Sequence, residues 1–258
     1  MIIPLVDGGA FRGIVPNRNQ VGRPLSSFFG YQVDGYFNTQ EELDASVFVN
    51  GDGQEVEAQP GQGLGRFKYR DLDGDGRITP EDRTYLGDPI PSYSGGAVVE
   101  LNYKQIKFEM FWNWVVGSEI WNQAKWFTDF FGTFEGAAKG VAAFDSWTPE
   151  LGNNAAVPIW ETESNLSTSA AGNSWYVEDG SYARLQRLAV QYSFDDNIKD
   201  ALGLTKFEIG LSANNLWTIT NYSGLDPVVA GDVDTEFGID VGNYPATPSY
   251  LINLNIGL

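Results

Sequence analysis

The sequence of 258 residues predicts an all-β fold made of long antiparallel strands. Apolar and polar residues alternate along several stretches, and this period of two is typical of a strand with one buried face. Each stretch is about 8–11 residues long, which is long for a globular strand and suitable for a tilted membrane-spanning strand. Pattern and length leave two architectures open, the wall of a transmembrane β-barrel and a soluble β-sandwich.

The alternation occurs in five stretches, of which the first two are joined by a tight turn near Lys104-Gln105. Lys, Glu, Asn and Gln residues occupy the other face of these strands, as in a wet barrel interior. The apolar positions are, in chain order, Ala97, Val99, Leu101 and Tyr103; Ile106, Phe108, Met110, Trp112, Trp114 and Val116; Leu188, Val190, Tyr192 and Phe194; Phe207, Ile209, Leu211 and Ala213; and Tyr250, Ile252, Leu254, Ile256 and Leu258.

Two connections, residues 117–181 and 216–249, are too long for hairpin loops and are rich in Gly, Asn, Ser and Thr. Loops of this length are usually functional or ordered by structure of their own. Apolar residues recur at helical spacing in the first connection, which predicts a short helix there. These residues are Ile120, Ala124, Phe127, Phe131 and Phe134.

Composition excludes several kinds of site. The chain has no Cys and no His, so disulfides, Cys-ligated zinc and Ser–His or Cys–His triads are impossible. Its net charge of −18 argues against nucleic-acid binding, which depends on Lys and Arg. Residues 1–16 lack a basic segment followed by an apolar one, so we expect no signal peptide, and we find no linker that divides the chain.

Residues 71–82 match the twelve-residue loop of calcium-binding proteins position by position. Oxygen-rich side chains at alternate positions can surround a large hard cation, and Gly76 allows the sharp turn. Position 12 is Asp82, where Glu is usual, so that ligand has a shorter reach. We expect a structural Ca²⁺ site; the alternative is an acidic turn that caps a helix. The expected ligands are Asp71, Asp73, Asp75, the Arg77 carbonyl, Thr79 and Asp82.

Several short segments occur in the order in which SusC/RagA-type TonB-linked outer-membrane proteins of Bacteroidetes carry them. One of them is Asn173-Ser174-Trp175-Tyr176-Val177-Glu178-Asp179-Gly180-Ser181-Tyr182 followed by Arg184-Leu185. The others are Gly22-Arg23-Pro24-Leu25, Arg70-Asp71-Leu72-Asp73-Gly74 with Leu86-Gly87-Asp88-Pro89, Ser146-Trp147-Thr148-Pro149-Glu150, Asn214-Asn215-Leu216-Trp217, Tyr222-Ser223-Gly224-Leu225-Asp226-Pro227, and Gly238-Ile239-Asp240 with Tyr244-Pro245. From about residue 17 onward the chain therefore resembles this family.

The resemblance implies the C-terminal segment of a transmembrane antiparallel β-barrel with long extracellular loops and a short helix or two within them. Such a barrel imports glycans or peptides across the outer membrane of a Gram-negative cell. A SusD-like lipoprotein covers it on the outside, and TonB supplies energy. Members of the family are several times longer and carry a plug domain, so residues 1–258 are expected to be a fragment without a plug.

The sequence leaves two other functions to consider. A soluble, calcium-stabilised β-domain could bind carbohydrate if tryptophans formed an exposed stacking platform; the candidates are Trp121, Trp126, Trp147, Trp160 and Trp175. An enzyme could use the neighbouring carboxylates of Glu178 and Asp179. Adjacent residues of an extended chain point to opposite faces, so we predict a turn or strand-entry role for this pair and no enzymatic activity.

Overall fold

The computed structural model describes residues 6–7, 11, 13–133, 136–229 and 237–258. They belong to two compact units, between which the chain passes several times. The sheet unit comprises Pro91–Ser118, Asp179–Val228 and Tyr244–Leu258. The loop unit comprises the described residues of Met1–Ile90, Glu119–Glu178 and Val229–Asn243.

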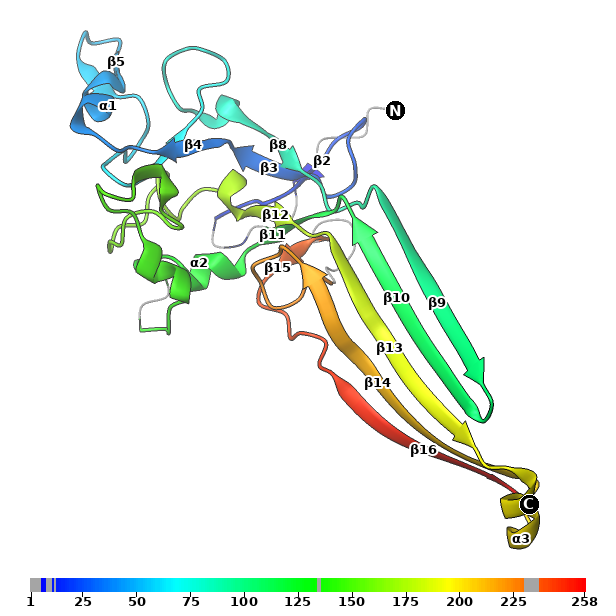
Figure 1. Cartoon of the computed structure of the whole chain (residues 1–258). Helices are drawn as coiled ribbons and strands as arrows, with labels where there is room; N and C mark the ends of the chain where they lie inside the picture. Colours follow the sequence, from blue (N-terminus) through cyan, green and yellow to red (C-terminus); the bar gives the residue numbers. More distant parts are fainter. Residues whose placement is uncertain (1–5, 8–10, 12, 134–135, 230–236) are drawn as a thin grey trace. The chain divides into compact units, whose positions relative to one another are not determined.

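The sheet unit is built on five antiparallel strands in the order β16-β14-β13-β10-β9 (Figure 1). Strands that follow one another along the sequence of this unit are neighbours, so the sheet is an up-and-down meander. The strands are β9 (Tyr93–Tyr103), β10 (Ile106–Val116), β13 (Tyr182–Ser193), β14 (Lys206–Thr220) and β16 (Ser249–Gly257). All five predicted strands are confirmed, and so is the all-β class.

A two-residue turn joins β9 to β10, as the alternation predicted. Tyr103 pairs with Ile106, and Lys104 between them has a φ of 53°. This left-handed backbone conformation is the one that two-residue hairpin turns need, because it matches the twist of the two strands.

The predicted end of β14 was wrong. The second long connection was expected from residue 216, but the strand continues to Thr220. The register shifts between Leu185 and Arg187 of β13, and Asn215 of the partner strand has a φ of 52°. A bulge of this kind breaks the period of two, so the sequence pattern ends before the strand does.

The loop unit consists of short strands joined by turns. Its strands are β1 (Val6–Asp7), β2 (Arg18–Asn19), β3 (Phe28–Tyr31), β4 (Val33–Tyr36), β5 (Val47–Val49), β6 (Glu55–Glu57), β7 (Phe67–Tyr69), β8 (Arg83–Gly87), β11 (Glu119–Asn122), β15 (Ile239–Asp240) and β12 (Val177–Asp179), whose last residue belongs to the sheet unit. β3 pairs with β8, β4 with β7 and β5 with β6, while β12, β11 and β15 form a three-stranded sheet.

The helices are short. They are α1 (Gln40–Ala45), α2 (Ala124–Thr128), α3 (Asp196–Leu202) and the 3₁₀ turns η1 (Pro80–Asp82), η2 (Val141–Asp145), η3 (Gly152–Asn154) and η4 (Ser174–Tyr176). α2 confirms a short helix in the first long connection, but it is only five residues long, and Ile120, the first residue of the predicted pattern, lies in β11 instead. Phe134, the last residue of that pattern, lies outside the described residues. Among the helices described, none has the length and apolar character to cross a membrane.

An aromatic core holds the loop unit together. Trp121 and Tyr176, fully buried, stack with ring centroids 5.1 Å apart, and Tyr31 stacks on Tyr69 at 4.9 Å. Phe67 is also fully buried in this cluster. Aromatic pairs combine a large buried area with a preferred geometry, so a few of them can order long irregular segments.

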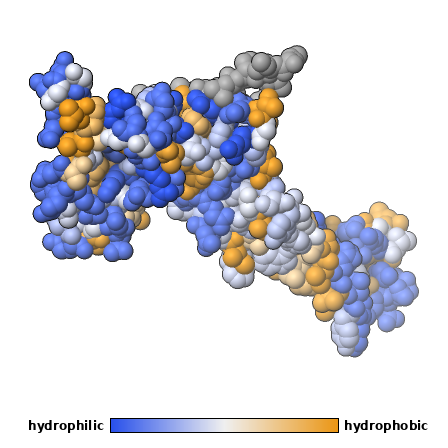
Figure 2. Space-filling view, turned by 90° about the horizontal axis from the view of Figure 1, so that it is seen from above, coloured by the Kyte–Doolittle hydropathy of each residue, from blue (hydrophilic) through white to orange (hydrophobic). Residues whose placement is uncertain are grey.

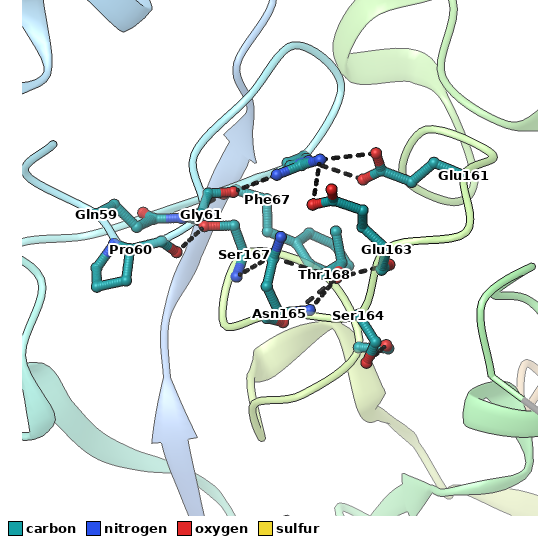
Figure 3. Close-up of polar contacts among 12 residues, drawn as sticks. Gln59, Pro60, Gly61, Phe67, Glu161, Glu163, Ser164, Asn165, Ser167 and Thr168 are labelled. Atoms are coloured by element: carbon teal, nitrogen blue, oxygen red, sulfur yellow. Dashed lines mark hydrogen bonds and ion pairs between the residues drawn. The ribbon is translucent and has the colours of Figure 1, made fainter.

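Polar contacts tie distant segments of this unit to each other (Figure 3). Arg66 forms a bidentate ion pair with the carboxylate of Glu161, at 2.7 and 2.8 Å, and also contacts Glu163 at 3.1 Å. The buried amide of Gln59 donates to the Phe67 carbonyl. It also donates to the Ser167 hydroxyl at 2.7 Å. The segment around residues 161–168 is therefore fixed to residues 59–67, as expected of a long connection with ordered structure.

Candidate functional site

The first functional feature is an apolar face on the sheet unit. The strand pairings bring Val99, Met110 and Leu188 into one row, and Leu211 lies beside Val190 in the next. The predicted apolar positions within the paired strands share this face, and Trp217 and Ile219 join it beyond the bulge. Phe194 and Leu258 lie just beyond the ends of their strands. No Asp, Glu, Lys or Arg of the five strands lies on it.

This apolar face is exposed. Leu211 is 60% exposed and Ile252 is 77% exposed, and Figure 2 shows hydrophobic residues at the surface of the sheet unit. An apolar patch that extends over five strands is far larger than a monomeric soluble protein usually exposes. A soluble β-sandwich would bury this face in its core. Because the face is exposed, the remaining architecture is the wall of a transmembrane β-barrel, with this face toward lipid.

The opposite face is polar and carries the charges of the sheet. Lys107 lies 3.5 Å from Glu100, and Arg187 lies 3.3 Å from Glu109. These pairs cross between neighbouring strands. Alternation of an apolar outer side with a polar inner side is the pattern of outer-membrane barrel strands.

The two ends of the sheet differ. At one end β9 and β10 are joined by two residues and β13 and β14 by a connection that contains α3. At the other end the chain leaves through residues 117–181 and 221–248, the two long connections. Short turns at one end and long loops at the other are typical of barrels in an outer membrane.

A buried ion pair fixes the second long connection where it leaves the sheet. Arg184 of β13 contacts Asp226 at 2.5 Å, with side chains 7% and 9% exposed. Asp226 also accepts hydrogen bonds from the backbone N–H groups of Val228 at 2.8 Å and Ala246 at 2.9 Å. One carboxylate therefore holds both branches of this connection. In the sequence, Asp226 stands out only as part of the segment Tyr222–Pro227 that resembles the family.

The second feature is the acidic loop at residues 71–82. Asp71, Asp73 and Asp82 each place a carboxylate oxygen within 4.8 Å of the others. Asp71 and Asp73 are exposed, whereas Asp82 is buried. Gly74 and Gly76 have φ values of 78° and 80°, so both glycines take the left-handed conformation that the sharp turns require.

Backbone N–H groups surround these carboxylates. Asp71 accepts from Gly74 at 2.7 Å and from Gly76 at 2.8 Å, and these bonds lower the pKa of its carboxyl group. Asp82 accepts from Leu72 and Thr79, both at 2.8 Å. Three carboxylates on one short loop, positioned by backbone donors, form a donor set that suits a hard cation.

Two of the other expected ligands have partners of their own. The carboxylate of Asp75 binds the guanidinium group of Arg77 at 3.0 and 2.5 Å. The hydroxyl of Thr79 accepts from the Glu81 N–H and caps η1, which begins at Pro80. Among the expected carboxylate ligands, the structure brings together those of Asp71, Asp73 and Asp82.

A group of buried charges in the loop unit has no counterpart in the sequence patterns. Lys125 lies 3.3 Å from Glu178, donates to the Trp175 carbonyl at 2.8 Å and sits 3.7 Å above the Trp175 ring. Burial lowers the pKa of Lys125, and Glu178 opposes this. Burial raises the pKa of nearby Asp129, opposed by a hydrogen bond from Thr128. Residue spacing cannot reveal such a group, because its members lie in separate segments.

The five candidate tryptophans form no exposed platform. Trp121 and Trp147 are buried in the aromatic core, and Trp126 and Trp175 pack against it. Trp160 is 37% exposed and pairs with Phe131, with ring centroids 5.3 Å apart. Stacking on a sugar requires exposed ring faces, which this arrangement does not present.

The neighbouring carboxylates Glu178 and Asp179 have separate structural partners. Glu178 pairs with Lys125 and accepts from Asn122 at 3.1 Å. Asp179 accepts from the Ser181 N–H at 2.8 Å and so shapes the turn before β13. Both residues belong to β12, directly before the turn that leads into β13, so each carboxylate has a structural place in the fold.

Comparisons with known proteins agree with this geometry. No family model matches the chain. It is 31% identical to TonB-dependent receptor P3 of Formosa agariphila over 91% of its length, and 28% identical to TonB-dependent receptor P26 of the same organism over 92%. The chain spans only 22% and 23% of these relatives.

Solved structures show the same fold. The chain superimposes on the structure of the RagAB peptide transporter with a TM-score of 0.67 and 18% identity, covering 94% of this chain and 24% of the other. For the RagAB peptide importer in the closed-closed state the TM-score is 0.65, at 19% identity and the same coverage. The five-stranded sheet therefore has the fold of a segment of a β-barrel.

Proposed function

We propose, since this chain belongs to the family of TonB-dependent receptors, that it forms part of an outer-membrane importer of nutrients, either glycans or peptides. The exposed, charge-free apolar face of the five-stranded sheet carries this proposal. The polar face would line the interior of the barrel, and the connections 117–181 and 221–248 would be extracellular loops. The family also suggests a SusD-like lipoprotein and TonB as partners of the whole importer, and offers no catalytic role.

Two adjacent residues of β14 allow a matched test of this orientation. Leu211 lies on the apolar face and Ser212 on the polar face. Arginine on the lipid face of a barrel costs about 2–4 kcal/mol at the bilayer centre, whereas interior positions tolerate it. Leu211→Arg should therefore lower the amount of protein assembled in the outer membrane, and Ser212→Arg should leave it unchanged. Equal amounts of the two variants would contradict the proposed orientation.

Import itself is tested by deleting the gene in its host. We expect the deletion strain to grow slowly when either a peptide mixture or a polysaccharide is the sole carbon source. Growth should return with the wild-type gene and with Ser212→Arg, but not with Leu211→Arg. Unchanged growth on every peptide and polysaccharide that the host uses would contradict a role in import.

For the acidic loop we propose a structural Ca²⁺ ion held by Asp71, Asp73 and Asp82, with the Arg77 carbonyl, Asp75 and Thr79 as the remaining ligands that its sequence suggests. The geometry of the three carboxylates supports this. Asp82→Asn removes a charged ligand and should weaken Ca²⁺ binding to the full chain at least tenfold in calorimetric titration. Asp52→Asn changes an exposed carboxylate outside the loop and serves as the control. Equal affinity in the two variants would contradict the site.

A further inference from the structure

The connection between β13 and β14 contains the helix α3, although a short turn would be enough to join these two antiparallel strands. Thr205, next to β14, and Ser193 of β13 lie at the same end of the sheet as the turn at Lys104. Two residues join neighbouring strands at that turn. The connection from β13 to β14 instead contains α3, so it is longer than joining the two strands requires.

α3 has well-formed ends. The side chain of Asp195 accepts from the Ile198 N–H at 3.2 Å. At the other end Gly203 has a φ of 69°, and its N–H returns to the carbonyls of Asp200 and Lys199. A helix of seven residues is nevertheless too short to be stable in water on its own, so it needs a surface to pack against.

The apolar side of α3 is uncovered. Ile198 is 39% exposed and Leu202 is 59% exposed. These residues are four apart, so they share one side of the helix. The side chain of Asp196, which pairs with Lys199 at 2.7 Å, is 87% exposed. α3 thus has an apolar side and a charged side, although it buries neither.

The apolar face of the sheet reaches this helix through an aromatic cluster. Phe194, directly before the helix cap, stacks on Phe207 with ring centroids 4.2 Å apart, and Tyr192 meets Phe194 at 5.0 Å. Hydrophobic and hydrophilic residues both appear at the end of the sheet unit where α3 lies (Figures 1 and 2). Aromatic residues at the end of an apolar band are typical of the boundary between membrane and water.

We infer that α3 lies in the headgroup layer of a phospholipid membrane, with Ile198 and Leu202 directed to the acyl chains and Asp196 to water. This inference rests on the proposed outer-membrane function, because it extends the apolar face of the sheet by one helix. Two apolar side chains are too few for a stable protein interface, whereas a short amphipathic helix continuous with a lipid-facing sheet suits an interfacial layer. α3 would then fix how deeply the short-turn end of the sheet enters the membrane.

The chain contains no Cys, so single-cysteine variants can be spin-labelled without background. We would label Leu202→Cys, Asp196→Cys and Leu211→Cys of the full chain in phosphatidylcholine vesicles, and compare collisions of each label with oxygen, which enters lipid, and with a water-soluble nickel chelate. The label at 202 should show a ratio of oxygen to nickel collisions several-fold higher than the label at 196.

The label at 211 separates two failures. If it reports lipid while the labels at 202 and 196 show equal ratios, the inference about α3 is overturned and the orientation of the sheet stands. If the label at 211 is as accessible to nickel as the label at 196, the apolar face does not meet lipid. That result overturns the membrane premise and the inference with it.

Discussion

The carboxylate of Asp226 should control how firmly the second long connection is held to the sheet. It pairs with Arg184 at 2.5 Å, and neither side chain is more than 9% exposed. Burial alone would raise the pKa of Asp226, but the N–H groups of Val228 and Ala246 and the charge of Arg184 outweigh it, so this pKa is lowered. The stabilisation is therefore fully present above the ordinary pKa of an aspartate and is lost as the pH falls through the lowered value.

Asp226→Asn keeps the shape of the side chain and removes the charge. Removing one partner of a buried ion pair costs about 3–5 kcal/mol, because the other charge stays buried. The asparagine oxygen can still accept one of the two backbone hydrogen bonds, so we expect the lower end of this range. A change of about 3 kcal/mol corresponds to roughly a hundredfold change in an opening equilibrium.

Hydrogen exchange read by mass spectrometry measures this opening directly. At pH 7, peptides that contain the amides of Val228 and Ala246 should exchange about a hundred times faster in Asp226→Asn than in the wild type. Asp196→Asn is the control: its pair with Lys199 is exposed, and surface pairs contribute about 0–1 kcal/mol. Adding Arg184→Met to Asp226→Asn should restore much of the protection. The reasoning is refuted if the single variant exchanges like wild type, or if the double variant is as open as the single.

Two further predictions concern the loop unit. Burial raises the pKa of the Asp129 carboxyl group in the folded protein. The ionised carboxylate therefore destabilises the fold by its full amount above this raised pKa, and not at all below the pKa of Asp129 in the unfolded chain. Asp129→Asn should therefore raise the melting temperature, followed by tryptophan fluorescence, more at pH 7 than at pH 4; a larger gain at pH 4 would contradict the sign. At Gly30 a Cβ atom would lie 2.4 Å from the Gly172 carbonyl oxygen, so Gly30→Ala should lower the unfolding free energy by about 1–3 kcal/mol. Gly51→Ala meets no atom within 4 Å and should change it by less than about 0.5 kcal/mol; equal losses would argue against this packing.

The sheet could be predicted from the sequence because its information is local. Each strand faces one apolar and one polar surrounding along its whole length, and the period of two records this directly. The pattern failed only around Asn215, where the bulge changes the side on which residues lie. The acidic loop was also local, so its glycines and the helix cap at Thr79 could be recognised, whereas the pairing of Asp75 with Arg77 could not.

The loop unit could not be predicted in the same way. Its strands have two to five residues, too few to show a period. Its core comes from pairs distant in sequence, such as Trp121 with Tyr176 and Tyr31 with Tyr69. The buried pair of Lys125 and Glu178 joins two segments that the sequence gives no reason to connect. Such contacts depend on tertiary packing, which a single sequence records only through the residue types involved.

The division of charge between the two units follows from their different surroundings. Of the net charge of −18, the full ranges Met1–Ile90, Glu119–Glu178 and Val229–Asn243 carry −16, from 10 Lys and Arg and 26 Asp and Glu residues, and the ranges of the sheet unit carry only −2. A charge on a lipid-facing strand is costly, so the strands confine their charges to the polar face and pair several of them there. Loops in water bear no such cost, and strong negative charge keeps a large irregular surface hydrated. The net charge of −18 argued against nucleic-acid binding, and most of it belongs to the proposed extracellular loops. The wall that would span the membrane is close to neutral.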